Sequence, residues 1–185
     1  MQPDQDKIST AADVLAFWRE AGPDKWFTRD DAFDADIREK FLPTYEAAAA
    51  GKLADWEGTA EGALALAIVL DQFPRNMFRG EARCYAADSQ ARGVAHRALK
   101  CGYEQDVPEA ERGFFFLPFM HSEDMDDQLR CVALYREAED ANLKYAERHA
   151  DIIRRFGRFP HRNAALGRTT TPEEQAYLDA DGFKG

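Results

Sequence analysis

The sequence predicts an all-α protein, and three observations carry that prediction. The 185 residues include 31 alanines but only five valines and five isoleucines, so helix formers far outnumber β-branched strand formers. Apolar residues recur at three- and four-residue spacing in several segments, which is typical of amphipathic helices. Proline and glycine fall where such segments begin and end. We expect seven to eight helices, packed as antiparallel pairs, in a single domain that spans residues 1–185.

The first two expected helices have clear starts and stops. Thr10 is a good N-cap for the first helix, and Gly22-Pro23 ends it. The second helix begins near Asp30 and carries an aromatic or aliphatic residue at every fourth position. Pro43 should kink or end this helix, because proline removes an amide and crowds the preceding turn. Gly51 is a natural stop for whatever helix follows Pro43.

The third expected helix, at about Thr59–Phe73, is apolar on nearly every side. A helix without a polar face is usually covered on all sides, so we expect this one to be central. A fourth helix is expected from about Glu81 to Lys100, and Gly102 is its stop.

The rest of the chain contains up to four more helices. Pro108 at a first-turn position begins a fifth helix, which leads into an aromatic block at 114–117. Ser122 is expected to cap a sixth helix, whose first turn is acidic. A seventh helix places His149 in the core and ends at Gly157. Thr171 begins a capping box for a short last helix.

Composition excludes several classes of function. The chain holds 24 lysines and arginines against 34 aspartates and glutamates, and this net charge of −10 disfavours nucleic acid and anionic membranes as partners. The longest aliphatic stretch, Ala63–Leu70, is far shorter than the roughly 20 residues of a membrane-spanning helix. Residues 1–7 lack the apolar core of a signal peptide. We therefore expect a cytoplasmic protein that binds neither nucleic acid nor membrane.

The cysteines predict neither a disulfide framework nor a metal site. Cys84, Cys101 and Cys131 are odd in number and widely spaced, and each lies in or beside an expected helix. Cysteine in such places usually behaves as a small buried apolar residue, and a reactive thiol is the alternative. We expect no metal and no cofactor.

One local pattern occurs twice and could bind an anion. A Phe-Pro pair is followed by Arg and Asn within residues 71–76 and again within 158–163, and each copy follows a largely apolar helix. Two readings are open. The proline and asparagine fix a turn whose arginines bond nearby carbonyls, or both turns present guanidinium groups to one carboxylate or phosphate.

Basic residues gather beside both copies of this pattern. Residues 75–100 hold six basic residues against two acidic ones, and residues 144–168 hold seven against two, within a chain that is acidic overall. If the two segments pack together, they form a local anion site. If they do not, the arginines neutralise acidic neighbours, which is the commoner role of surface charge.

A third segment, residues 119–124, offers groups for acid–base chemistry. His121 precedes an expected helix start, and Glu123 follows it closely, so this histidine is a candidate general acid or base. The structural alternative is that Ser122 caps the helix while His121 fills a corner. The sequence shows no glycine-rich phosphate loop and no Gly-x-Ser-x-Gly nucleophile motif.

Three segments together resemble a known family. They read LDQFPRN at 70–76, FMHSE at 119–123 and FGRFPHRN at 156–163. In this order and spacing they resemble the bacterial domain of unknown function family 924, and the resemblance covers nearly the whole chain. It implies an all-α, tetratricopeptide-like right-handed superhelix, and it brings no established activity.

Three functions from different classes remain open. The favoured one is a binding module for a small anionic molecule or a peptide carboxylate, in which Arg75 and Arg162 clamp the acid. The second is a hydrolase or transferase with His121 or His161 as acid/base and Glu123 as its orienting partner. The third is a scaffold that pairs with another protein. The candidate ligand-binding residues are Asp71, Gln72, Arg75, Asn76, Arg79, Ser122, Arg158, Arg162 and Asn163.

Overall fold

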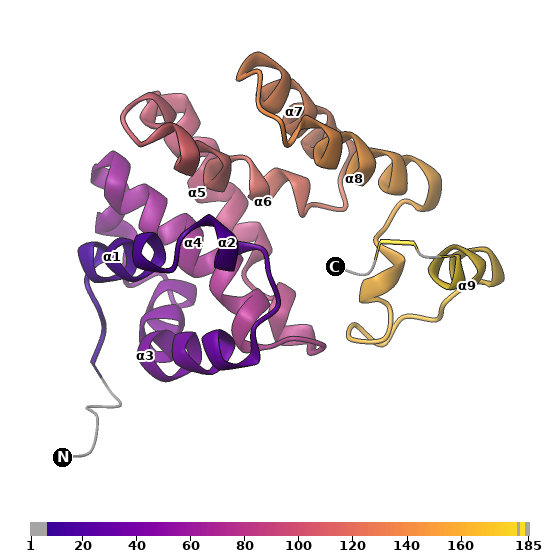
Figure 1. The fold of residues 1–185 in the computed structure, drawn as a ribbon, viewed down its shortest axis with the longest axis horizontal. Helices are drawn as coiled ribbons and strands as arrows, with labels where there is room; N and C mark the ends of the chain where they lie inside the picture. Colours follow the sequence, from indigo (N-terminus) through magenta and orange to yellow (C-terminus); the bar gives the residue numbers. More distant parts are fainter. Residues whose placement is uncertain (1–6, 181, 184–185) are drawn as a thin grey trace. The chain divides into compact units, whose positions relative to one another are not determined.

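A computed structural model describes residues 7–180 and 182–183, and these residues form only helices, turns and loops. This confirms the all-α prediction (Figure 1). The N-terminal residues 1–6, to which most of the signal-peptide prediction applies, lie outside the described residues.

The chain divides into two compact units. Unit 1 consists of residues 1–79 and 83–118, and unit 2 of residues 80–82 and 119–185. The expected single domain and the tetratricopeptide-like superhelix both stay predictions.

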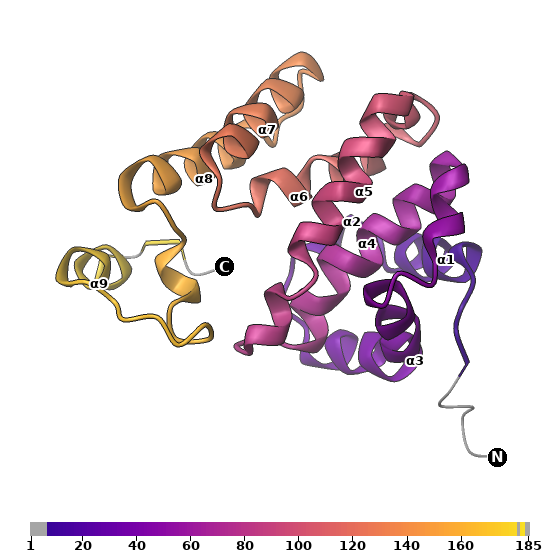
Figure 2. The ribbon, with the colours of Figure 1, turned by 180° about the vertical axis from the view of Figure 1, so that it is seen from behind.

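Unit 1 is built around a helix that is buried on all sides. Every residue from Ala63 to Leu70 in helix α4 is at most 3% exposed. Helices α1, α3 and α5 pack around α4, as Figures 1 and 2 show from opposite sides. The central position predicted from its apolar sequence is therefore confirmed. The helices of unit 1 are α1 (Ala11–Ala21), α2 (Pro23–Trp26), α3 (Asp31–Ala49), α4 (Ala60–Met77) and α5 (Asp88–Cys101), with 3₁₀ helices η1 (Ala54–Gly58), η3 (Tyr103–Gln105) and η4 (Glu109–Phe115).

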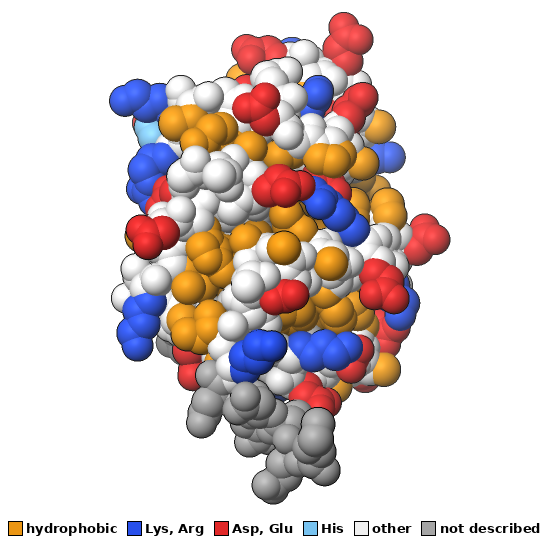
Figure 3. Space-filling view, turned by 90° about the vertical axis from the view of Figure 1, so that its left-hand side faces the viewer, with side chains coloured by type: hydrophobic (Ala, Val, Ile, Leu, Met, Phe, Trp, Pro, Cys, Tyr) orange, Lys and Arg blue, Asp and Glu red, His pale blue; other side chains and the backbone are white. Residues whose placement is uncertain are grey.

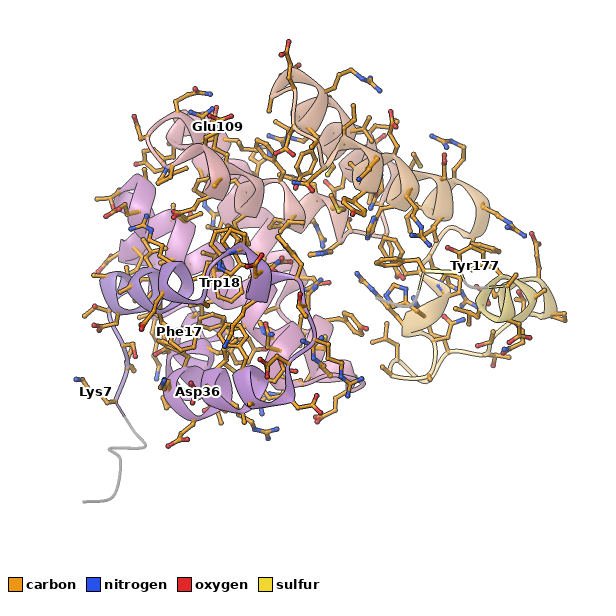
Figure 4. The ribbon with its side chains drawn as sticks, viewed as in Figure 1. Lys7, Phe17, Trp18, Asp36, Glu109 and Tyr177 are labelled. Carbon is orange, nitrogen blue, oxygen red and sulfur yellow. The ribbon has the colours of Figure 1, made fainter. Side chains whose placement is uncertain are left out.

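An aromatic cluster fills the space between α1 and α4. Trp18 is 1% exposed and its ring lies against those of Trp26, Phe73 and Phe114, at centroid distances of 6.0, 5.7 and 5.6 Å. The indole of Trp26 donates a hydrogen bond to the carbonyl of Trp18 at 2.7 Å. Figure 4 shows Trp18 directed inward, whereas one outer face carries mixed acidic and basic side chains with apolar side chains between them (Figure 3).

Unit 2 contains a helical hairpin followed by irregular chain and a last helix. In the hairpin, α7 packs against α8, and Ile152, Ile153 and Phe159 form the buried apolar core. Gly157 has φ of 68° and ends α8 in the left-handed region, as predicted. Thr171 forms the predicted capping box of α9. The helices of unit 2 are α7 (Met125–Glu137), α8 (Leu143–Phe156), η5 (Pro160–Arg162) and α9 (Pro172–Asp179), whereas η2 (Ala82–Tyr85) and α6 (Leu117–Met120) bridge the division between the units.

Two prolines lie inside helices instead of ending them. Helix α3 continues through Pro43 to Ala49, and α4 continues through Pro74 to Met77. Proline in a helix interior costs about 3 kcal/mol. The residues beyond each proline are deeply buried, among them Tyr45 at 3% exposure and Met77 at 4%. Each such side chain gains roughly 1.5–3 kcal/mol on burial, which offsets the lost hydrogen bond.

Two helix starts differ from those predicted. Asp124, not Ser122, is the N-cap of α7, and its carboxylate accepts from the N–H groups of Asp126 and Asp127. An ionised oxygen is a stronger acceptor for these amides than a hydroxyl. The expected fourth helix begins later, at Asp88, because residues 82–85 form a 3₁₀ turn. The segment after Pro108 is likewise 3₁₀ rather than α-helical.

Two cysteines are buried, as expected, and one is not. Cys84 and Cys131 are buried, whereas Cys101 is exposed at the end of α5, and none of the three forms a disulfide. Burial raises the pKa of the Cys131 thiol to about 12, so this group is protonated and unreactive at neutral pH.

We expect Gly62→Ala to destabilise unit 1 by about 1–3 kcal/mol, since a Cβ at this position would lie 2.1 Å from the carbonyl oxygen of Trp56. Gly58→Ala is the matched control, because no atom lies within 4 Å of its Cβ position. Urea unfolding followed by tryptophan fluorescence measures the effect, since all three tryptophans belong to unit 1. Equal midpoints for the two variants would contradict the close approach.

Candidate functional site

In unit 1, the first copy of the repeated pattern forms a buried ion-pair network. The guanidinium of Arg75 donates to both carboxylate oxygens of Asp88 at 3.1 and 3.2 Å, and to the carbonyl of Asp71 at 2.6 Å. One of its nitrogens also lies 3.3 Å from the carboxylate of Asp71. The side-chain amide of Gln72 donates to that same carboxylate. Arg75 thus links the end of α4 to the start of α5.

Burial and charge act on Arg75 in opposite directions. Burial alone would lower its pKa, but the carboxylates of Asp71 and Asp88 outweigh burial and raise the pKa above its ordinary value. Asp71 is 1% exposed and Asp88 is 8% exposed, so three charged groups share a nearly dry environment. Such a network is costly to break, because removal of one member leaves the others uncompensated.

The remaining polar residues of this copy bind α3. Asn76 donates to the carboxylate of Asp34 at 2.7 Å, and Arg79 holds both oxygens of the same carboxylate through two nitrogens. Asp34 raises the pKa of the Arg79 guanidinium through a direct hydrogen bond. Asn76 therefore joins α4 to α3, and Arg79 joins the turn after α4 to the same helix.

The second copy of the pattern folds differently from the first. Gly157 stands where the first copy has Asp71, and its positive φ ends α8 two residues before Phe159. The Phe-Pro pair of the second copy therefore opens the 3₁₀ turn η5, whereas Phe73-Pro74 lies within α4. The prediction of two equivalent turns is wrong, since only the second copy is a turn.

Arg158 and Asn163 of the second copy anchor α9. Both oxygens of the Glu174 carboxylate accept from Arg158, at 2.6 and 2.8 Å, and one also accepts from Asn163 at 3.1 Å. The N–H of Thr171 donates to that carboxylate at 2.8 Å. Arg158 and the Thr171 amide together lower the pKa of Glu174 to about 2, against the effect of burial.

Glu123 ties the 119–124 segment to the chain around η5. Its carboxylate accepts from the backbone N–H of Phe159 at 2.7 Å and from two nitrogens of Arg168 at 2.8 and 3.0 Å. Partial burial would raise the pKa of Glu123, but Arg168 and the Phe159 amide outweigh it and lower the pKa. A backbone amide combined with a bidentate arginine is a strong carboxylate-binding arrangement, and here it holds a side chain of the protein itself.

A buried glutamine shapes the loop that carries His121 and Ser122. The amide of Gln128, which is fully buried, donates to the carbonyls of Met120 and Ser122, both at 2.7 Å. The hydroxyl of Ser122 accepts from the N–H of Asp124 and donates to the carboxylate of Asp127. Arg162 donates to the carbonyl of His121 at 2.8 Å, so this loop is held from two sides.

Three histidines gather in unit 2 around two phenylalanine rings. The ring of His149 lies 6.5 Å from that of His121 and 5.6 Å from that of Phe159, and the ring of His161 lies 5.6 Å from Phe159. Phe183 contacts His149 and His161, at 4.5 and 5.2 Å. His149 is 6% exposed, which confirms its predicted core position.

His149 and His161 are neutral at physiological pH. Burial, supported by the neighbouring positive charge of Arg162, lowers the pKa of His149 to about 4 and that of His161 to about 3. The Nδ1 of His149 bonds the carbonyl of Tyr145 at 2.7 Å. The Nδ1 of His161, by contrast, is buried and has no hydrogen-bond partner among the described residues.

The structure thus divides the candidate residues between the two units. Asp71, Gln72, Arg75, Asn76 and Arg79 lie together in unit 1, and His121, Ser122, Glu123, Arg158, His161, Arg162 and Asn163 lie together in unit 2. Within residues 7–180 and 182–183, no group of three or more His, Cys, Asp or Glu side chains is arranged to hold a metal ion. No helix in this part of the chain is long and apolar enough to cross a bilayer.

The sequence alone did not predict several of the partners in these networks. Asp34, Asp88 and Glu174 complete the ion pairs of the arginines, and Phe183 completes the histidine cluster. Only Glu174 had a sequence signal, since it is the capping-box glutamate of the last helix. The others come from distant parts of the chain, and spacing along the sequence does not reveal such pairs.

Comparison with known proteins places this all-helical chain in a family. Residues 14–182 match the profile of the bacterial protein family of unknown function DUF924. The chain belongs to this family, which confirms the resemblance seen in its motifs. It is also similar to the solved structure of the protein of unknown function ATU0120 from Agrobacterium tumefaciens, with 50% identity, coverage of 92% of this chain and 97% of the other, and a TM-score of 0.89. No curated protein matches the chain.

Arg75→Gln is expected to destabilise unit 1 by about 3–5 kcal/mol, because it leaves the buried carboxylates of Asp71 and Asp88 without their cation. Arg29→Gln is the control, since it breaks an exposed ion pair with Asp31 in the same unit and should cost at most about 1 kcal/mol. Urea unfolding followed by tryptophan fluorescence measures both. A loss at Arg75 as small as that at Arg29 would show that the network contributes little.

The carboxyl group of Glu174 should titrate with a midpoint of about 2 in the folded protein, because Arg158 and the Thr171 amide stabilise its charged form. The stabilisation is complete above the ordinary glutamate pKa of about 4.3 and is lost as the pH falls toward 2. Carbon-detected NMR of the side-chain carboxyl measures the midpoint. In Arg158→Gln the midpoint should rise, and an unchanged midpoint would assign the shift to something other than Arg158.

Proposed function

We propose that this protein is a binding module for a small anionic molecule or a peptide carboxylate, and that unit 2 carries the site. His161 and Arg162 would contact the anion, with His121 and Asn163 beside them. The observation that carries the proposal is the buried Nδ1 of His161, which lacks a hydrogen-bond partner among the described residues. Buried polar atoms are nearly always bonded to protein, water or ligand, so such an atom is a reason to look for a bound group.

Local chemistry favours an anion at this place. Neutral His161 can donate one N–H, and Arg162 next to it supplies positive charge. The nearby amide of Phe159 and Arg168 already hold the carboxylate of Glu123, so groups of the same kind suit a carboxylate from a ligand. An anion beside His161 would also raise its pKa, and binding should then be accompanied by proton uptake in mildly acidic buffer.

The residues of unit 1 are less suited to this role. Arg75 and Arg79 each hold an aspartate through two nitrogens, and a ligand would have to replace these bonds. We therefore assign them to the packing of α3, α4 and α5 and do not retain the clamp by Arg75. Catalysis by His161 ranks second, because an imidazole with a pKa of about 3 is a weak base at neutral pH.

The proposal is tested by calorimetric titration of the full chain with inorganic phosphate and with a short peptide, supplied with a free or an amidated C-terminus. We expect millimolar or tighter binding of at least one anion, and loss of binding by tenfold or more in His161→Phe, which keeps the ring but removes the nitrogen. Preference for the free over the amidated peptide would identify a peptide carboxylate, and preference for phosphate a small inorganic anion.

Arg154→Gln is the matched control for Arg162→Gln, since each removes one positive charge and Arg154 pairs with Asp151 on an exposed face of α8. Binding should be unchanged in the first and weakened in the second. If no probe binds the wild-type protein, or if both arginine variants behave alike, the assignment of an anion site to His161 and Arg162 is wrong.

A further inference from the structure

A short segment after α9, Gly182-Phe183, is fastened to Tyr177 of that helix. The N–H of Gly182 donates to the carbonyl of Tyr177 at 3.0 Å, and the N–H of Phe183 donates to its phenol oxygen at 3.0 Å. A Cβ at Gly182 would lie 2.4 Å from that carbonyl oxygen and 2.7 Å from the Tyr177 ring, so only glycine allows this approach. Tyr177 is labelled in Figure 4.

The ring of Phe183 lies against two imidazoles from separate elements. Its centroid is 4.5 Å from that of His149 on α8 and 5.2 Å from that of His161 on η5, and both contacts are edge-to-face. Phe183 also packs against the apolar core formed by Ile152, Ile153 and Phe159. The segment therefore places an aromatic side chain against both histidines, of which His149 is buried and His161 is partly exposed.

The positive charges around these imidazoles disfavour protonation of either ring. Arg148 on α8 lies 5.5 Å from the Phe183 ring, and Arg162 of η5 acts on both histidines. His121, from the preceding loop, adds to the same effect when it is protonated. Among the described residues, Glu123 acts on His161 in the opposite direction, and Arg168 already pairs with its carboxylate.

We propose that Gly182-Phe183 is an acid-releasable strap, which covers His149 and His161 while both imidazoles are neutral and leaves them when they are protonated. An uncharged imidazole packs against a phenyl ring as an aromatic group. A charged one requires water, and the arginines on either side repel it. Release exposes the Nδ1 of His161, so the strap controls access to this atom whether or not an anion binds there.

The direction of the pH dependence follows from proton linkage. Burial lowers the pKa of both imidazoles, so an open state that returns them to water binds more protons than the closed state between about pH 4 and pH 6.5. The strap is fully favoured above pH 6.5 and is weakened as the pH falls. Between pH 7.5 and pH 5, each imidazole can increase the open-to-closed ratio by at most roughly 30-fold.

Two measurements on the full chain test the strap, and the first is an NMR titration of the histidine ring protons. In the wild-type protein His149 and His161 should titrate well below pH 6, and Phe183→Ala should raise both midpoints by at least one pH unit. Phe27→Ala is the control, because it removes an exposed phenyl ring that belongs to unit 1, whereas both histidines and Tyr177 belong to unit 2. Unchanged midpoints in Phe183→Ala, or equal shifts in both variants, would overturn the proposal.

The second measurement is hydrogen exchange of the Gly182 and Phe183 amides in the wild-type protein. After correction for intrinsic rates, their protection should fall tenfold or more from pH 7.5 to pH 5, while amides of α4 stay protected. The double variant His149→Phe, His161→Phe should keep the strap closed at both pH values. Protection that is independent of pH in the wild type, or equally pH-dependent in the double variant, would exclude protonation of these histidines as the trigger.

Discussion

The arrangement of the helices in unit 1 follows from the burial of α4 on all sides. Such a helix has no face in contact with solvent. Each polar group near its end therefore needs a hydrogen-bond or ion-pair partner from a neighbouring helix. Helix α4 becomes polar at Asp71, and from there Arg75 is bound by Asp88 of α5, and Arg79 by Asp34 of α3. These ion pairs fix which ends of the three helices meet, and they explain why polar residues follow so apolar a stretch.

In unit 2, the polar groups that need bonding partners lie in loops and not at the end of a central helix. The chain between α8 and α9 forms short hydrogen-bonded turns, and side chains supply further bonds to its backbone. Glu123 bonds the amide of Phe159 and Arg168, and Glu174 bonds Arg158 and Asn163. Each carboxylate thus joins segments that are far apart in sequence, and the pKa of each is lowered because its charged form holds those bonds.

The histidines give unit 2 a property that unit 1 lacks. The guanidinium of Arg75 keeps its charge over the whole physiological range, because its two carboxylate partners raise a pKa that is already high. Buried neutral imidazoles behave differently, since their ordinary pKa lies near 6.5 and only burial and nearby arginines hold them uncharged. The side chains that pack against His149 and His161, Phe183 among them, are therefore coupled to pH through these imidazoles.

The sequence by itself determined the helical class, the central position of α4 and most helix ends, because alanine content, periodicity and capping are local properties. It also identified the family, through motifs that include Arg75 and His161. Only the tertiary structure decided which carboxylate each arginine meets and that Pro74 stays within a helix while Pro160 opens a turn. Those outcomes depend on burial and on residues distant in sequence, such as Asp88 for Arg75. Local sequence patterns therefore do not predict them.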